Sequence, residues 1–177
     1  DNPLVREAGP GVLTGFLTGF ISGNYQPLTV ASYIADRQVF GLDPGPFHLV
    51  NLALHLVNTV LVLRLLVGLG TPLSAAAIAS LFWAVHPLRV EAVAWVSGRK
   101  DLLATGLSLA SILAWMTFLR EGKRSRAFLS TAIYFLALLA KGTAIIVPAL
   151  LVLVEWLQGR RITMATQRAK MPHLVIA

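Results

Sequence analysis

Residues 102–119 read LLATGLSLASILAWMTFL, and none of these positions carries a charge. About 20 apolar residues in a helix are enough to cross the hydrocarbon core of a bilayer, which is about 30 Å thick. The stretch is therefore predicted to be a membrane-spanning helix.

The composition of the whole chain agrees with this prediction. Of its 177 residues, 56% are hydrophobic and 13% are charged, and the mean hydropathy is +0.72. Soluble domains carry about 25% charged residues, roughly twice as many, so this chain has too few charges to coat a water-exposed globule. It contains no cysteine, which excludes disulfide scaffolds, zinc–thiolate sites and cysteine nucleophiles.

Apolar segments on both sides of residues 102–119 extend the prediction to a bundle. The second span is expected to stop at His86-Pro87, because a residue before proline is disfavoured in the helical region. The fourth and fifth are short arms separated by Lys141-Gly142. The predicted fold class is an all-α, polytopic membrane helix bundle of about five spans: 46–68, 73–85, 102–119, 127–140 and 143–157.

The remaining parts of the chain are more polar. Residues 1–45 are predicted to form an outer loop with two short interfacial helices, one over 12–20 and one over 27–40, and residues 44–46 a proline-rich turn. Residues 88–98 are expected to form a short amphipathic helix between two spans of the bundle, which covers 46–157. Residues 158–177 are a basic cytoplasmic tail or the start of a further segment.

The charged residues sort onto opposite ends of such a bundle. With residues 1–45 outside, the excess of Lys and Arg leaves a net charge of +7 on the inner side and zero on the outer side. A basic inner face binds anionic lipid headgroups, so the net positive charge does not require a nucleic-acid partner.

The most polar connector reads HPLRVEAVAWVSGRKD over residues 86–101. It is either a solvated connector or a site, and the second interpretation is favoured because ionisable groups held near apolar spans commonly face a cavity. Gly98 would let backbone approach an anion. Asp101 also fits as the N-cap of the following helix, which would be a purely structural role.

Two other features leave two interpretations each, and a third has a local explanation. One helix face carries His48, Asn51, His55 and Asn58. This face forms either a hydrogen-bonded seam between helices or a haem or chlorophyll site built on His48 and His55. Lys141 is a snorkelling turn residue or a cation aimed at a phosphate. Tyr25-Gln26 precedes Pro27 and is typical of a helix start.

Several motifs resemble the transmembrane and tetratricopeptide-repeat O-mannosyltransferase family. They are NYQPLT (24–29), FGLDP (40–44), FHLVNLALH (47–55), HPLRVEAVAWVSGRKDLL (86–103) and LLAKGT (138–143). The resemblance covers most of residues 1–157, and residues 86–101 are its most specific part.

The resemblance implies a GT-C glycosyltransferase that moves a sugar, with inversion, from a polyprenyl-phosphate donor to a protein hydroxyl on the non-cytoplasmic side. A divalent metal ion is a possible cofactor. It also implies a first helix and an acidic pair before Asp1, so this chain is expected to be inactive alone. Residues 160–177 are too few for a repeat of about 34 residues. The expected location is a bacterial inner membrane or, in a eukaryote, the endoplasmic reticulum membrane.

Residue roles follow from this resemblance and from the chemistry of the reaction. Glu91 is the candidate base, since an acceptor hydroxyl needs a carboxylate to take its proton, and Asp101 is the second catalytic candidate. The candidate groups for binding substrate and phosphate are His86, Arg89, Arg99, Lys100, Lys141, Tyr25 and Gln26. The alternatives are a non-catalytic membrane anchor or subunit, and a His-ligated haem or pigment protein.

Overall fold

The computed structural model describes residues 25–160 and 163–176, and every regular element among them is helical. The predicted all-α class is confirmed, and the second of the two short helices predicted in residues 1–45 has the predicted bounds. The first, over 12–20, lies outside the described residues. The elements are α3 (Pro27–Phe40), α4 (Pro44–Gly68), α5 (Leu73–Ala84), α6 (Pro87–Ala94), η1 (Val96–Gly98), α7 (Arg99–Glu121), α8 (Arg124–Ala140), η2 (Gly142–Ile146), α9 (Val147–Leu157) and α10 (Met164–Ile176).

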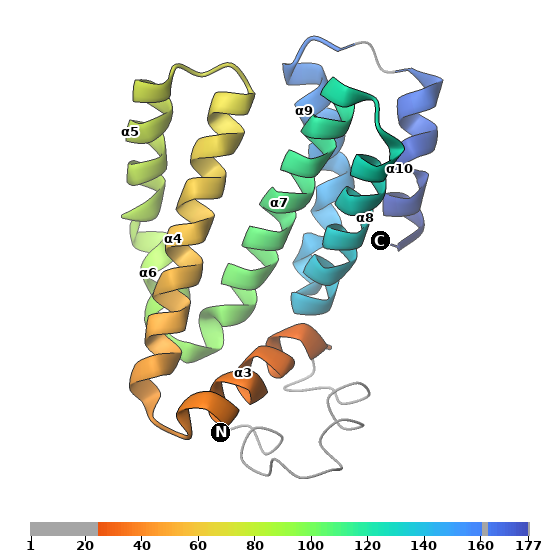
Figure 1. Ribbon diagram of the computed structural model, residues 1–177. Helices are drawn as coiled ribbons and strands as arrows, with labels where there is room; N and C mark the ends of the chain where they lie inside the picture. The colour runs from red at the N-terminus through yellow and green to blue at the C-terminus, as the bar shows by residue number, and fades with distance from the viewer. Residues whose placement is uncertain (1–24, 161–162, 177) are drawn as a thin grey trace.

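The long helices alternate in direction and give the bundle two distinct ends. Helix α3 crosses one end, which also holds η1, η2 and the start of α7 (Figure 1), and we call it the α3 end. The α4–α5 and α7–α8 turns lie at the other end, which we call the basic end. Residues 86–101 and 120–126 are therefore at opposite ends, as the predicted alternation requires.

Local signals set the helix boundaries, with three differences from the sequence-based expectations. Helix α4 starts at Pro44, not after a turn at 44–46, because Asp43 Oδ1 accepts a hydrogen bond from Gly45 N at 3.0 Å and proline suits a first helical turn. Helix α6 ends at Ala94, before a separate 3₁₀ turn. Helix α7 already starts at Arg99, so Asp101 lies inside its first turn and is not its N-cap.

By length and composition, fewer helices qualify as membrane spans than the five that were predicted. Within the described residues, two helices are long and apolar enough to cross a membrane, Pro44–Gly68 and Val96–Glu121. A third span is added if α5 and α6, which are bent by 59° relative to each other, count as one. The apolar segment Gly142–Leu157 is shorter. All five predicted segments are helical, but the prolines at 87 and 148 and the break at Lys141 interrupt the apolar runs.

The interior lies between α7, α8 and α9, where Trp115, Tyr134, Val147 and Leu151 are fully buried. Large apolar side chains of α5 instead point outward, with Phe82 71% exposed. Apolar residues on both the inside and the outside of a helix bundle are typical of a protein surrounded by lipid.

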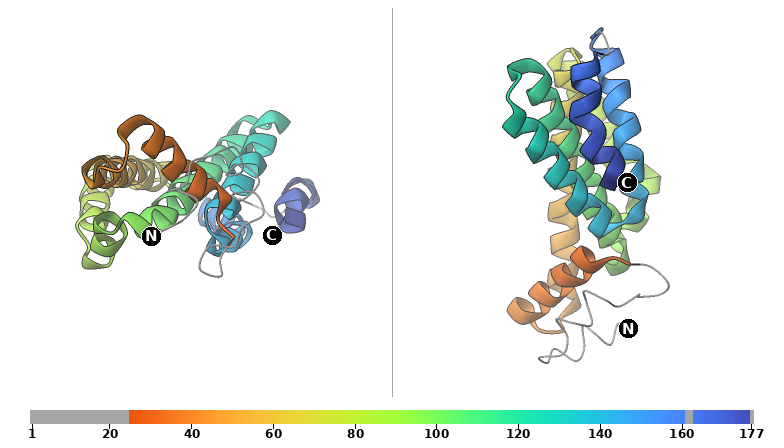
Figure 2. Two further views of the ribbon diagram at one scale, coloured as in Figure 1. Left: turned by 90° about the horizontal axis from the view of Figure 1, so that it is seen from below. Right: turned by 90° about the vertical axis from the view of Figure 1, so that its right-hand side faces the viewer.

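Helix α10 packs against α8 and α9 (Figure 2). Lys170 Nζ donates to Glu155 Oε2 at 2.8 Å, and Trp115 Nε1 donates to Glu155 Oε1 at 3.0 Å. Both charged side chains are at most 2% exposed. The charges of Glu155 and Lys170 therefore neutralise each other inside the bundle.

Candidate functional site

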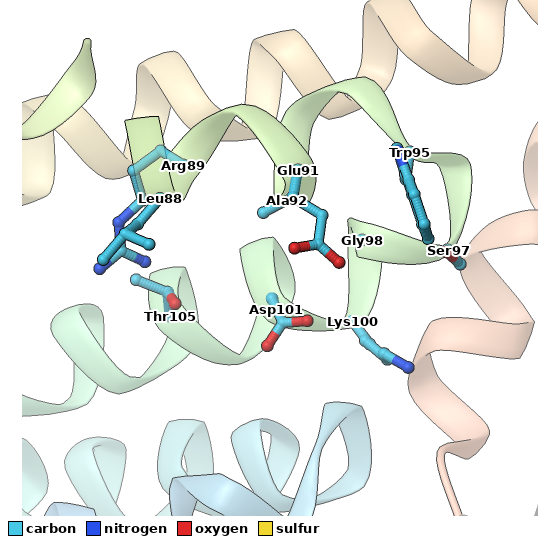
Figure 3. A pocket seen from close by; sticks show the side chains of 10 residues that line it. All are labelled: Leu88, Arg89, Glu91, Ala92, Trp95, Ser97, Gly98, Lys100, Asp101 and Thr105. Carbon is cyan, nitrogen blue, oxygen red and sulfur yellow. The ribbon is translucent and has the colours of Figure 1, made fainter. Parts of the chain in front are cut away.

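A pocket of about 390 Å³ opens at the α3 end, between α6, η1 and the first turns of α7 (Figure 3). Four of the predicted site residues line it: Arg89, Glu91, Lys100 and Asp101. The structure thus brings together the most polar part of residues 86–101, as the interpretation of this stretch as a site requires. Its other lining residues are Leu88, Ala92, Trp95, Ser97, Gly98 and Thr105.

The chain forms this pocket by reversing direction between α6 and α7. Proline 87 opens α6, and Nδ1 of His86 accepts a weak hydrogen bond from Leu88 N at 3.3 Å. Trp95 is extended, so the chain leaves the α6 axis before the turn at 96–98. The turn then brings Gly98 against Ala92: a Cβ on Gly98 would lie 2.4 Å from the Ala92 carbonyl oxygen. Only glycine fits this approach.

The two carboxylates of the pocket come from different elements. The Glu91 side chain points from α6 toward α7, and Asp101 lies on the facing turn of α7 (Figure 3). Asp101 forms an ion pair with Lys141, which follows the last residue of α8. Since Asp101 is 40% exposed, this pair stays in contact with solvent and can exchange partners with a ligand.

The predicted phosphate-binding cations lie in different surroundings. Lys100 lines the pocket, and in Figure 3 its ammonium points away from Asp101. Arg89 lines it too, with its guanidinium 4.8 Å from the centre of the Trp83 ring. These two side chains and Lys141 keep their charges close to the pocket.

Arg99 differs from them because it is fully buried. It pairs with Asp36 of α3, and its Nε and Nη2 donate to Asn51 Oδ1 at 2.9 Å and to the Phe47 carbonyl at 3.0 Å. Its guanidinium also stacks 4.7 Å above the ring of Tyr33. Arg99 therefore joins α3, α4 and α7 directly behind the pocket.

Asp36 and Tyr33 were not among the predicted residues. Tyr33 donates a hydrogen bond to the Val96 carbonyl at 2.6 Å. Burial raises the pKa of the Tyr33 phenol to about 12, partly offset by the nearby Arg99 charge. Tyr33 and Asp36 are three residues apart, so they share one face of α3, and this spacing was the signal in the sequence that could have found them. Nothing in the sequence of α3 itself indicates that their partner is Arg99 on α7.

Tyr25 and Gln26 lie where α3 begins, beside the Lys141 turn. Thr29, in the first turn of α3, donates to the Ala140 carbonyl at 3.0 Å and fixes this position. The two residues do not line the pocket. Gln26 precedes α3 without a side-chain capping bond.

The polar face of α4 forms a seam between helices. Asn51, His55 and Asn58 are buried and contact the carbonyl oxygens of Trp95, Ala84 and Leu102 at 2.9–3.0 Å. His48, near the start of α4, is exposed. The ring of His55 also stacks on Trp83 at 5.4 Å, and this stacking together with the contact of Nε2 to a backbone carbonyl suits a seam better than an axial ligand.

The described residues contain no group of three or more His, Asp or Glu side chains placed to hold a metal ion. The pocket offers two carboxylates, one of them paired with Lys141. These residues by themselves do not fit a metal site.

Comparison with known proteins places the chain beside O-mannosyl-transferases. It is 33% identical over 150 residues to protein O-mannosyl-transferase TMTC1 of Homo sapiens, a match that covers 79% of this chain and 17% of that protein. The mouse TMTC1 is 36% identical over 118 residues, covering 66% of this chain and 12% of the relative. Tmtc2 of Drosophila melanogaster is 38% identical over 99 residues, covering 55% and 11%.

No family model and no solved structure matches the chain. It spans less than a fifth of the length of the curated relatives that it matches. The chain is therefore a relative of the TMTC protein O-mannosyl-transferases and is similar to a short segment of these longer proteins.

Proposed function

We propose that this chain forms part of a GT-C-type membrane glycosyltransferase that transfers a mannose-like sugar from a polyprenyl-phosphate donor to a protein hydroxyl. The pocket at the α3 end carries the proposal, because it combines two carboxylates with cationic side chains at one end of an apolar bundle. The names of the relatives support the reaction class. The α3 end would face the non-cytoplasmic side of a bacterial inner membrane or of the endoplasmic reticulum.

Glu91 would be the base of this reaction. The acceptor oxygen attacks the anomeric carbon while the bond from that carbon to the phosphate oxygen breaks, and Glu91 takes the hydroxyl proton. The side chain points into the pocket, and no salt bridge among the described residues involves it. Its carboxylate is therefore available to an acceptor.

The departing polyprenyl phosphate gains negative charge as the sugar leaves. Arg89 and Lys141, and Lys100 once its side chain rotates toward the phosphate, would stabilise this charge, since cations close to the place where charge develops lower the barrier. Asp101 holds Lys141 at the pocket until the phosphate is present. Arg99 contributes by positioning: its buried donors are bonded to Asp36, Asn51 and Phe47, and it anchors the first turn of α7 that carries Lys100 and Asp101.

The test uses the full-length protein in membranes, with a polyprenyl-phosphate mannose donor and a serine- and threonine-containing acceptor. Glu91→Gln removes the proton acceptor with little change in shape, and transfer should fall by about 10²–10⁴-fold. The control is Glu121→Gln, which removes a carboxylate at the basic end, 34% exposed and paired with Lys123. This control should keep wild-type transfer.

Wild-type transfer by Glu91→Gln would contradict the role of Glu91. If Asp101→Asn and Lys141→Gln were also neutral, the pocket would not be a transfer site, and the non-catalytic membrane subunit would be the better description. Expression and thermal unfolding of each variant, measured in parallel, separate loss of chemistry from loss of fold.

A further inference from the structure

A second pocket lies at the basic end, far from the candidate site. It measures about 500 Å³ and lies between the end of α4, the first residue of α5 and the end of α7. This volume is within the range of about 300–1,000 Å³ that is usual for small-molecule sites. Its walls are largely apolar: Leu63, Val67, Leu73, Leu113 and Met116.

Two arginines also line this pocket, Arg64 from α4 and Arg120 from α7. Arg120 Nη2 donates to the Gly68 carbonyl at 3.0 Å, which holds the guanidinium at the rim. None of the ion pairs found in residues 25–160 and 163–176 includes either arginine. The neighbouring Lys123 and Arg126, in contrast, are compensated by Glu121 at 3.2 and 3.7 Å.

We propose that this pocket binds an acidic phospholipid of the surrounding bilayer, with its phosphate between Arg64 and Arg120 and its acyl chain along the apolar wall. The guanidinium fork matches phosphate oxygens, and basic pockets between membrane helices are suited to acidic headgroups. Val67 and Leu73 are 43% and 67% exposed, so the apolar wall continues onto the outer surface of the bundle, where acyl chains lie.

The apolar wall also favours a phospholipid over free phosphate as the ligand of this pocket. A soluble phosphate would leave the exposed side chains of Val67 and Leu73 in contact with water, whereas the acyl chain of a lipid would cover them. The site does not depend on the proposed sugar transfer, since none of its residues lines the pocket at the α3 end.

The experiment measures lipid retention by native mass spectrometry on the purified chain. Micelles are supplied with equal amounts of phosphatidylglycerol and phosphatidylcholine. Arg64→Gln is the main variant, because the Arg64 side chain is exposed and no described side chain pairs with it. Its matched control is Arg124→Gln, which removes one exposed arginine at the same end, outside the pocket. Leu113→Trp fills the pocket without changing charge.

Wild type and Arg124→Gln should retain phosphatidylglycerol in preference to phosphatidylcholine. Arg64→Gln should retain about fivefold less, the effect of one cation near a lipid phosphate, and Leu113→Trp should also lose the bound lipid. Equal loss in Arg64→Gln and Arg124→Gln would overturn the proposal in favour of a diffuse charge effect. Equal retention of both lipids, or displacement by millimolar inorganic phosphate, would overturn it as well.

Discussion

Gly98 shows how one residue shapes the candidate site. A Cβ at this position would lie 2.4 Å from the carbonyl oxygen and 2.7 Å from the Cα of Ala92, and both are backbone atoms that cannot rotate away. The approach of η1 to α6 sets the distance across the pocket between Glu91 and Asp101. The absence of a side chain is thus what lets the polar connector fold back on itself.

Gly98→Ala should therefore move η1 away from α6. We expect a loss of about 1–3 kcal/mol in the free energy of unfolding, typical of forced overpacking, together with reduced transfer by the full-length protein. Gly142→Ala is the control, since a Cβ there has no atom within 4 Å. Thermal unfolding of the two variants in detergent measures the loss of stability. Equal melting temperatures for Gly98→Ala and Gly142→Ala would show that the backbone adapts without cost.

Tyr33 gives a pH dependence at the same scale. Its folded-state pKa is raised to about 12, above the ordinary value of about 10 for tyrosine, so the neutral phenol is favoured in the folded protein. The stabilisation is complete below about pH 10 and is lost as pH rises toward 12, because the unfolded chain releases the proton first. Two pKa units correspond to about 2–3 kcal/mol.

In Tyr33→Phe this alkaline loss of stability should be smaller than in wild type, while the aromatic ring below Arg99 is kept. The ultraviolet absorbance of tyrosinate should also lose one transition near pH 12. If the transition lost in Tyr33→Phe lay near pH 10 instead of near pH 12, Tyr33 would ionise normally and its bond to Val96 would not hold in solution.

At the scale of elements, α10 is attached to the bundle through a buried ion pair. Lys170 contacts Glu155 at 2.8 Å, and Trp115 donates to the same carboxylate. His173, fully buried, adds contacts of 3.1 and 3.2 Å to Ser130 and Thr131. These polar contacts hold in place a helix whose own sequence is interrupted by Pro172.

Lys170→Met should be strongly destabilising, by about 3–5 kcal/mol, because it leaves the Glu155 charge buried without a partner. The double variant Lys170→Met with Glu155→Gln removes both charges and keeps an oxygen for Trp115, so it should recover most of the loss. Hydrogen exchange of α10 and thermal unfolding measure the cycle. Additive losses in the double variant would show that the two side chains do not interact.

At the scale of the whole molecule, the alternating direction of the helices places the carboxylate-containing pocket and the arginine-lined pocket at opposite ends of the bundle. The two ends of the bundle can be followed in Figure 1. The carboxylate pocket is lined by residues of the α3 end, and Arg64 and Arg120 line the second pocket at the basic end. The distribution of Lys and Arg along the sequence predicts the same separation, which is the usual pattern for proteins oriented by the positive-inside rule.

This arrangement predicts that Ser97 and Ser125 are reachable from opposite sides of a membrane. Both are exposed, and the chain has no cysteine of its own, so Ser97→Cys and Ser125→Cys each provide one labelling site. In sealed vesicles, a membrane-impermeant maleimide should label one variant before permeabilisation and the other only afterwards. Labelling of both from the same side would contradict the topology and the orientation of the candidate site.

The sequence by itself determined the apolar helical segments, the breaks at Pro87 and Lys141 and the end at which the polar connector lies, but not how many segments span a membrane. Hydrophobicity sums along a segment, and the backbone restriction before Pro87 acts locally, so neither needs a tertiary partner. The sequence also brought Arg89, Glu91, Lys100 and Asp101 into one pocket, because they share a short connector.

Only the tertiary structure decided which charges pair with one another. Arg99 and Asp36 are 63 residues apart, Lys141 and Asp101 are 40 apart, and neither contact follows from local spacing. Adjacent basic residues therefore have different surroundings: Lys100 lines the pocket, whereas Arg99 is buried behind it. The physical reason is that burial and partner choice depend on which helices pack together, and packing joins positions that are distant in the chain.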